Sequence, residues 1–112
     1  MLLVQAVEVV TAVDDRDRAE RMAMESVALR VCACAQVSGP VSSSYEWKGS
    51  RETSTEWTVT FKAPLPLRDK LAGFVRDMHP YELPEILCRE VLVSQEYFEW
   101  MESVTTRSRV QG

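Results

Sequence analysis

The clearest pattern along the chain is a strict alternation of apolar and polar positions in residues 57–62. Apolar Trp57, Val59 and Phe61 alternate there with Thr58, Thr60 and Lys62. This period of two is typical of a strand that buries one face. A second alternating run comes just before it and consists of Val41, Ser43, Tyr45 and Trp47. Residues 48–51 between the two runs have turn composition, so we predict one long β-hairpin.

Two other stretches repeat their apolar residues at helical spacing. The stronger stripe consists of Leu67, Leu71, Phe74, Val75 and Met78. A weaker stripe, earlier in the chain, consists of Ala19, Met22, Ala23, Ser26 and Val27. We expect Asp14 to cap this earlier helix, because an aspartate side chain accepts hydrogen bonds from the free N–H groups at a helix start. The helix should end near Arg30.

The remaining segments complete the order of elements. Residues 4–13, 31–37 and 86–93 have strand patterns, and the second of these should continue into the hairpin through a bulge at residues 38–40. Ser94 can cap a final helix whose apolar stripe consists of Tyr97, Trp100, Met101 and Val104. Residues 105–112 are polar, and we expect them to form a frayed tail.

This order of elements predicts an α+β fold. The order β-α-β-β-α-β, followed by a helix, is that of the split βαβ or ferredoxin-like plan, here as a single domain over residues 1–112. Such a plan has a four-stranded antiparallel sheet with both main helices on one face. The hairpin aromatics Tyr45, Trp47 and Trp57 are costly to leave in water, so we expect a homo-oligomer to cover them.

Composition narrows the classes of function. The 112 residues carry a formal net charge of −4, which argues against a nucleic-acid partner. No apolar run reaches the length of a membrane span, and the first four residues do not resemble a signal peptide. The three cysteines give an odd count with no disulfide framework. We therefore expect a cytoplasmic protein with no membrane partner.

The most unusual segment is residues 79–85, which read His-Pro-Tyr-Glu-Leu-Pro-Glu. Each proline fixes its own φ and disfavours helix at the residue before it, so the segment should be extended and rigid. It carries the only histidine of the chain together with a tyrosine and two carboxylates. A rigid segment with these groups is a candidate site, although a helix stop before a strand would also explain it.

Residues 79–85 resemble the His-Pro-Tyr-x-x-Pro-Glu signature of the CutA family, the divalent-cation-tolerance proteins. Weaker matches to that family fall in the right order over residues 4–105: Thr11 and Asp14, Ala33-Cys34, Ser43, Tyr45, Trp47 and Gly49, Glu56 and Lys62, and Tyr97 with Trp100. The resemblance implies a homotrimer of ferredoxin-like subunits whose hairpins extend across their neighbours. It also implies a role in tolerance of divalent metals, copper above all.

The chain departs from the family pattern at three places. Ser50 stands where the family usually has a lysine, Gly39-Pro40 reverses the usual Pro-Gly, and Val10 stands where some members carry a cysteine implicated in metal binding. Ser50 puts any role of that lysine in doubt, and Val10 removes one soft ligand.

The candidate metal ligands are His79 and Cys34. Neutral imidazole binds copper or zinc, and a thiolate is a soft ligand. If Cys32 and Cys34 both lie in a strand, their side chains point to the same face, although small cysteines in a core strand are usually inert packing. With one histidine and no Cys-x-x-Cys pair, we expect weak or transient binding of copper or another divalent metal rather than a permanent four-ligand site.

A second candidate set consists of Glu56, Lys62, Tyr81 and Glu85. Glu56 and Lys62 lie six residues apart on one strand face, and in a trimer they could line a cleft with Tyr81 and Glu85. The chain has no nucleophile elbow, phosphate loop or cofactor fingerprint, so we expect neither an enzyme nor an organic cofactor.

Three hypotheses of function follow. The leading one is a cytoplasmic CutA-like trimer that binds divalent metal weakly at subunit boundaries and contributes to metal homeostasis. The second is a signalling trimer that binds a small ligand or a partner protein in the cleft between subunits, which rests on fold analogy. The third is a structural trimer that anchors other chains.

Overall fold

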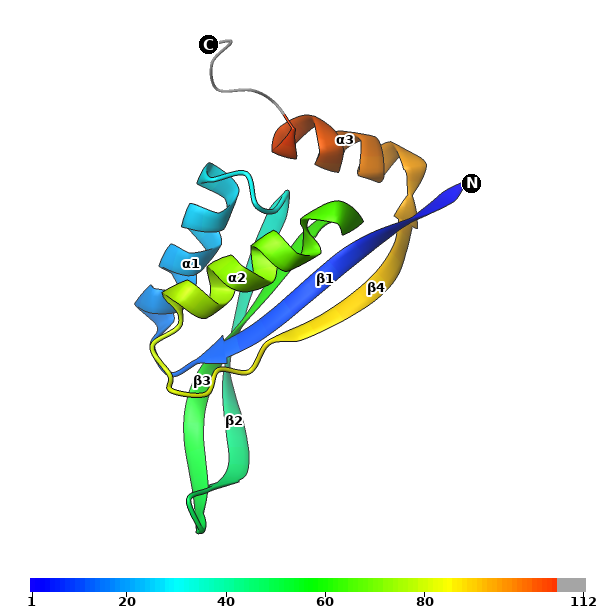
Figure 1. Ribbon diagram of the computed structural model, residues 1–112. Coiled ribbons are helices and arrows are strands. Elements are labelled where there is room, and N and C mark those ends of the chain that lie inside the picture. The colour runs from blue at the N-terminus through cyan, green and yellow to red at the C-terminus, as the bar shows by residue number, and fades with distance from the viewer. Residues whose placement is uncertain (107–112) are drawn as a thin grey trace.

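The computed structural model describes residues 1–106. Its elements, in chain order, are β1 (Leu3–Val13), α1 (Arg16–Ala28), β2 (Cys34–Trp47), β3 (Ser50–Pro64), the 3₁₀ turn η1 (Leu65–Leu67), α2 (Arg68–Met78), β4 (Leu87–Ser94) and α3 (Gln95–Thr105). Figure 1 shows one sheet with α1 and α2 beside it and α3 at the end away from the hairpin tip. No helix in this part of the chain is long and apolar enough to cross a membrane.

The sheet has four strands in the order β2-β3-β1-β4, and every neighbouring pair is antiparallel. Val9, near the middle of β1, pairs with Phe61 of β3 on one side and with Cys88 of β4 on the other. The predicted α+β fold with a four-stranded antiparallel sheet is therefore confirmed at this level.

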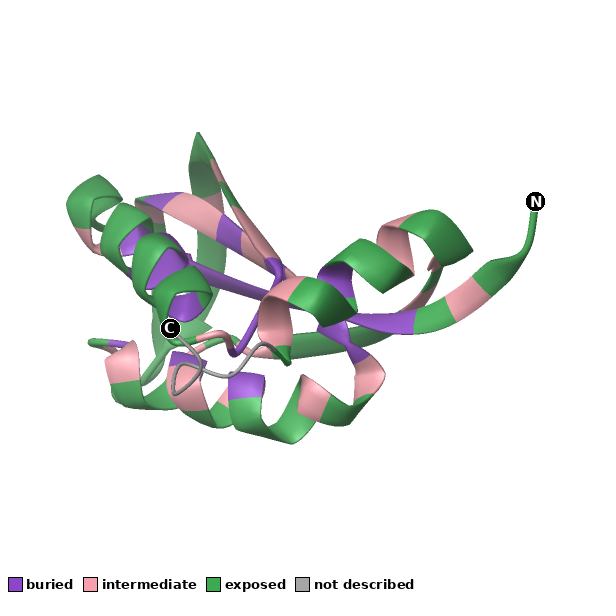
Figure 2. Ribbon diagram, turned by 90° about the horizontal axis from the view of Figure 1, so that it is seen from above, coloured by how far each residue is buried: buried purple, intermediate pink, exposed green. Residues whose placement is uncertain are grey.

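The main core lies between one face of the sheet and the helices α1 and α2. Val7, Val9 and Val13 point to this face from β1, because residues two apart on a strand share a face. They pack with Phe61 of β3 and with four buried helix residues, Met22, Ala23, Leu71 and Val75. Buried and exposed positions alternate along the helices that cover the sheet, so each helix buries a single side (Figure 2).

The third helix covers one end of the opposite face of the sheet. Met101 of α3 is fully buried and packs with Ala6 of β1, whose neighbours on that face are Val91 and Val93 of β4. The predicted N-cap is confirmed, since Ser94 Oγ accepts a hydrogen bond from the Tyr97 N–H. The rest of this face, which neither α3 nor any other helix of the described chain covers, is called the open face below. Its exposed apolar side chains are Val41, Tyr45, Trp47 and Leu87.

The β2–β3 hairpin extends well beyond the helices (Figure 1). The predicted bulge is confirmed, because the register of the two strands shifts between Ser38 and Val41. Gly39 has a φ of +140°, a conformation that side chains disfavour, and a Cβ there would lie 2.9 Å from the Trp57 ring. Beyond the bulge the strands pair regularly to the turn at residues 48–49.

Three sequence expectations need correction. Asp15, not Asp14, caps α1, and its side chain accepts hydrogen bonds from the backbone N–H groups of residues 17 and 18. Val27, expected on the buried stripe of α1, is exposed, whereas Ser26 of the same stripe is buried and donates its hydroxyl to the Ala23 carbonyl. Cys32 lies before the strand rather than in it, since β2 begins at Cys34.

The position of Trp57 also differs from the expectation. Trp57 pairs with fully buried Val13 and packs against the helix-covered core, whereas only Tyr45 and Trp47 lie on the open face. At the chain end, Thr105 still belongs to α3. Residues 107–112 of the expected frayed tail lie outside the described residues.

Candidate functional site

The segment between α2 and β4 begins at His79, which is 9% exposed. The Tyr81 backbone N–H donates to His79 Nδ1 at 3.2 Å, so the ring proton lies on Nε2, which donates to the Ala12 carbonyl at 2.9 Å. Both ring nitrogens are therefore engaged within the protein. Burial lowers the pKa of His79 below its ordinary value, because the charged imidazolium is poorly solvated there.

Next in the segment, Tyr81 reaches across to the hairpin. Its hydroxyl donates to Glu56 Oε2 at 2.7 Å, and its ring meets the His79 ring edge-on at a centroid distance of 4.6 Å. Burial raises the pKa of Tyr81, and its hydrogen bond to the Glu56 carboxylate raises it further. The tyrosine therefore stays protonated and acts as a fixed donor to Glu56.

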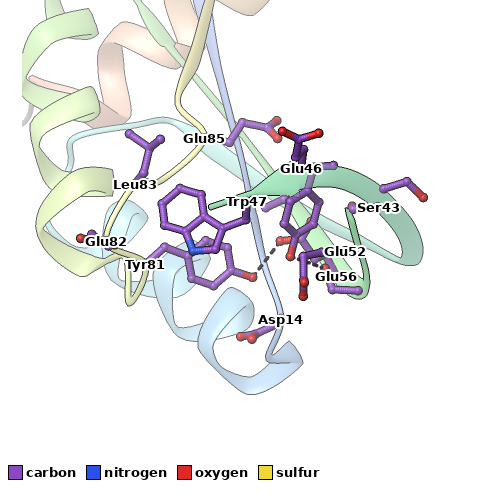
Figure 3. Close-up of a pocket in the computed structure, with 14 residues that line it drawn as sticks. Asp14, Ser43, Glu46, Trp47, Glu52, Glu56, Tyr81, Glu82, Leu83 and Glu85 are labelled. Carbon is purple, nitrogen blue, oxygen red and sulfur yellow. Dashed lines mark hydrogen bonds between the residues drawn. The ribbon is translucent and has the colours of Figure 1, made fainter. Parts of the chain in front are cut away.

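Both residues line a pocket of about 760 Å³ between the far part of the hairpin and the 79–86 segment. Figure 3 shows the Tyr81 hydroxyl directed at Glu56, with the hydrogen bond between them as a dashed line. The volume lies within the range usual for small-molecule sites. We call it the acidic pocket, because six carboxylates line it: Asp14, Glu46, Glu52, Glu56, Glu82 and Glu85. None of its lining residues, all of which lie in the described part of the chain, is Lys or Arg.

Aromatic side chains supply the apolar part of the lining. Tyr45 and Trp47 come from the end of β2, and Tyr81 comes from the 79–86 segment. Trp47 and Tyr81 are labelled in Figure 3. At the hairpin turn, Lys48 Nζ lies 5.5 Å from the centroid of the Trp47 ring and 3.6 Å from Glu82 Oε2. The hairpin turn and the 79–86 segment are thus joined by an exposed ion pair.

Glu56 has an unusual environment for a carboxylate. It is only 7% exposed, and within residues 1–106 its side chain has one hydrogen-bond donor, Tyr81, and no ion-pair partner. Burying a charge without an opposite charge is unfavourable. The pocket therefore favours a cation next to Glu56.

The structure brings together three of the four residues in the second candidate set. Glu56, Tyr81 and Glu85 all line the acidic pocket. Lys62 lies apart from them, in a smaller cavity of about 220 Å³ beneath α3 that Glu8 and Tyr97 also line. The shared face expected for Glu56 and Lys62 is confirmed by the strand register, but the two side chains belong to different cavities.

The structure places the two candidate metal ligands in different surroundings. His79 adjoins the acidic pocket through Tyr81, whereas Cys34 pairs with Lys62 at the start of β2 and is half-buried beside Tyr97. Cys32 Sγ donates to Ser26 Oγ at 3.1 Å, and burial raises the pKa of its thiol to about 11. Cys32 is therefore an inert core thiol, and the two cysteines do not share a strand face.

A single chain offers few ligands to a metal. Among residues 1–106, no three His, Cys, Asp or Glu side chains converge closely enough to hold an ion. The donor set of the acidic pocket nevertheless fits divalent cations in kind, because carboxylate oxygens are common ligands for them.

Sequence reasoning missed three carboxylates of the pocket, Asp14, Glu46 and Glu52, whereas Glu82 belongs to the candidate segment 79–85. A signal existed for Glu52. Once the hairpin turn is placed at residues 48–49, the pairing puts Glu52 opposite Tyr45, on the same face as Glu56. No comparable signal exists for Asp14, because its approach to the hairpin depends on how the hairpin curls.

Comparison with known proteins places the chain among related sequences. Residues 7–104 match the profile of the CutA1 divalent ion tolerance protein family. A probable divalent-cation tolerance protein cutA homolog of Encephalitozoon cuniculi (strain GB-M1) is 39% identical over 89 residues, which cover 79% of this chain and 77% of that protein. Protein CutA of Homo sapiens is 34% identical over 88 residues, 78% of this chain but only 49% of the human protein.

Solved structures agree with these sequence matches. CutA from Synechococcus elongatus PCC7942 superposes with a TM-score of 0.85 at 28% identity and covers 93% of this chain and 96% of that one. The arrangement of helices and strands described above is therefore that of a known family of structures.

Proposed function

The chain belongs to the CutA1 divalent ion tolerance family, and from that premise we propose that it contributes to divalent-cation tolerance by binding copper or another divalent cation in the acidic pocket. The observation that carries the proposal is the lining of this pocket. Six carboxylates line it, with no lysine or arginine among the lining residues, so the local potential attracts cations.

We infer that binding is weak and that copies of the chain share the site. The described residues of one chain supply no three converging ligands, so a neighbouring copy must add donors if the ion is held by more than two side chains. A homotrimer is the proposed assembly. The exposed Val41, Tyr45, Trp47 and Leu87 of the open face support it, and the strand order β2-β3-β1-β4 supports the ferredoxin-like plan from which such a trimer would be built.

Copper is the proposed metal on chemical grounds. For a given set of oxygen and nitrogen donors, Cu²⁺ binds more tightly than the other divalent ions of the first transition row. His79 is a proposed ligand beside the pocket, although a metal on Nδ1 would have to displace the hydrogen bond from the Tyr81 N–H. Cys34 is a proposed ligand only if another copy brings it toward a shared site.

Isothermal titration calorimetry with Cu²⁺ and Zn²⁺ tests this proposal. The variants are Glu56→Gln, His79→Ala and Cys34→Ser. Glu25→Gln is the matched control, because it removes the same charge from an exposed position on α1. We expect Glu56→Gln to lower the affinity for both metals by about tenfold, a loss of about 1.4 kcal/mol. We expect the control to match the wild type.

The same titrations separate the proposed ligands. Heats for His79→Ala equal to those of the wild type would remove His79 from the site, and the same outcome for Cys34→Ser would remove Cys34. Cu²⁺ binding that Glu56→Gln leaves unchanged would overturn the placement of the metal in the acidic pocket.

A second candidate function is a signalling protein that binds a small ligand or a partner in the same pocket. The volume of about 760 Å³ exceeds what a metal ion needs, and the aromatic walls suit an organic molecule. Glu56, Tyr81 and Glu85 are the proposed contacts, and Lys62 would join them only through the smaller cavity of another copy. Both candidate functions are proposed as binding roles without catalysis.

The proposed compartment is the cytoplasm. All three cysteines are free, which suits a reducing environment. Fractionation of cells that express the tagged protein would test this, and recovery in an organelle or in a periplasmic extract would contradict it.

A further inference from the structure

The acidic pocket contains a charge that the described chain leaves unbalanced. Glu56 is more than nine-tenths buried and lines the pocket, yet its carboxylate receives one neutral hydrogen bond and no cation. The five other carboxylates around the pocket add to the negative potential at this point. A ligand that brings positive charge to Glu56 would offset the cost of burying it.

At the rim of the pocket, the ammonium group of Lys48 contacts an aromatic ring and a carboxylate. Lys48 Nζ sits between the face of the Trp47 ring, at 5.5 Å, and the Glu82 carboxylate, at 3.6 Å. Attraction of an ammonium to an indole face, with a carboxylate beside it, is a recognised mode of binding organic cations. The ammonium group of Lys48, a side chain of the protein itself, therefore occupies one of the positions that an amine of a ligand would use.

We propose that the acidic pocket binds a small organic polyamine, a chain of protonated amines joined by methylene segments. This inference rests on the second function proposed above and names the chemistry of its ligand. One amine pairs with Glu56 in the interior, and another lies between Trp47 and Glu82 at the rim. The methylene segments contact the aromatic rings of Tyr45 and Tyr81.

The mixture of groups in the pocket suits a ligand whose positive charges lie apart from one another. A metal ion requires several oxygen donors within one coordination sphere, and in the described part of one chain no such group converges. A polyamine spreads its charges along its length, so it can use carboxylates that lie apart. The aromatic rings in the lining can contact methylene groups and can attract ammonium groups to their faces, but they offer no donor atoms to a hydrated metal.

Calorimetric titration with spermidine, after removal of metal with EDTA, tests the inference on the full chain. 1,8-Octanediol serves as the uncharged chain, glutamate as an anion, and trilysine represents lysine side chains of a partner protein. We expect spermidine to bind, and added salt to weaken it because charge attraction is screened. We expect no heat from the diol or from glutamate.

Variants locate the binding. We expect Glu56→Gln and Trp47→Leu each to lower the affinity for spermidine by about tenfold. The matched controls are Glu25→Gln for the charge and Trp100→Leu for the indole, since neither residue lines the pocket. Lys48→Gln removes the competing ammonium and should raise the affinity, which mere structural damage would not do.

The outcomes separate this inference from the functions on which it rests. No spermidine binding, binding unchanged by Glu56→Gln, or no gain with Lys48→Gln would overturn it. Binding of glutamate or the diol without spermidine would also overturn it while leaving the small-ligand function standing. Tighter binding of trilysine than of spermidine would assign the pocket to a protein partner instead. The separate titrations with Cu²⁺ test the metal function, whatever the result with these organic ligands.

Discussion

At the scale of single residues, Glu56 and Tyr81 link two parts of the chain that are 25 positions apart. Glu56 brings a buried charge, and Tyr81 brings a donor whose proton is held firmly because burial and the carboxylate both raise its pKa. His79 fixes the start of the 79–86 segment through its bonds to Ala12 and to the Tyr81 N–H. The pocket therefore depends on a short chain of hydrogen bonds from β1 to the hairpin.

Tyr81→Phe tests the first of these bonds. The change leaves the buried Glu56 carboxylate without its donor, and we expect the free energy of unfolding to fall by about 1–3 kcal/mol in urea denaturation. Tyr45→Phe is the control, because its hydroxyl makes only an exposed 3.3 Å contact with Ser54. Equal stability of the two variants would show that the Tyr81–Glu56 bond contributes nothing.

His79 predicts a pH dependence with a definite sign. The folded state lowers its pKa below the ordinary 6.5, so the unfolded chain binds the proton more readily. Stability from this group is complete above pH 6.5 and declines as the pH falls through that value toward the lower pKa of the folded state. His79→Gln cannot titrate, so its deficit in melting temperature relative to the wild type should shrink between pH 7.5 and 5. If the difference in melting temperature between the two proteins stayed constant over this range, His79 would not be the source of the pH dependence.

At the scale of elements, the hairpin forms the pocket because it bends at the bulge and extends toward the 79–86 segment. Gly39 permits the bulge, since its φ is +140° and a Cβ at this position would crowd Trp57 and the Glu56 carbonyl. Glu56 of β3 pairs with Val41, the first paired residue of β2 beyond the bulge. A change in the bulge therefore reaches the pocket through the backbone of β3.

Paired glycine substitutions test this role. Gly39→Ala forces a side chain into a disfavoured φ and against the Trp57 ring, and we expect a loss of about 1–3 kcal/mol in the free energy of unfolding. Gly73→Ala in α2 is the control. A Cβ there meets nothing within 4 Å, so we expect a gain of about 0.5–1 kcal/mol. The account of the bulge fails if thermal melting shows both variants shifted in the same direction.

The elements themselves were largely predictable, because local patterns determine them. The alternation around Val59 predicts β3, and the spacing of Leu71 and Val75 predicts α2, since each pattern has a single buried face. The predicted stripe of α1 was wrong at one member, Val27, which is exposed. Ser26, the polar member of that stripe, is buried as expected, and its hydroxyl bonds Ala23 and Cys32. The Tyr81–Glu56 contact was not predictable in detail, because it depends on the curl of the hairpin.

At the scale of the whole molecule, the open face is the feature that one chain leaves incomplete. Leu87 is 51% exposed and Trp47 is 38% exposed on this face. The acidic pocket lies at the edge of the same face, next to the hairpin. A homotrimer that buries the open face would place the pocket at a subunit boundary, where a neighbour could complete it.

Sedimentation velocity tests the assembly. We expect a species of three times the 12.7 kDa chain mass for the wild type at micromolar concentration. Leu87→Glu places a charge on the open face and should shift the protein toward the monomer. Met24→Glu is the control, because Met24 is 71% exposed on α1, away from that face. A monomeric wild type, or a trimer that Leu87→Glu leaves intact, would refute the open face as the interface.

The central claim is that cations bind in the acidic pocket, and paramagnetic NMR tests it most directly. Cu²⁺ broadens the amide resonances of residues close to it. On addition of Cu²⁺ at low stoichiometry, we predict selective loss of the signals from residues 43–56 and 79–85, with the signals of α1 beyond Asp17 and of α3 retained. Broadening centred on Cys34 and Lys62, or no selective broadening, would contradict the account.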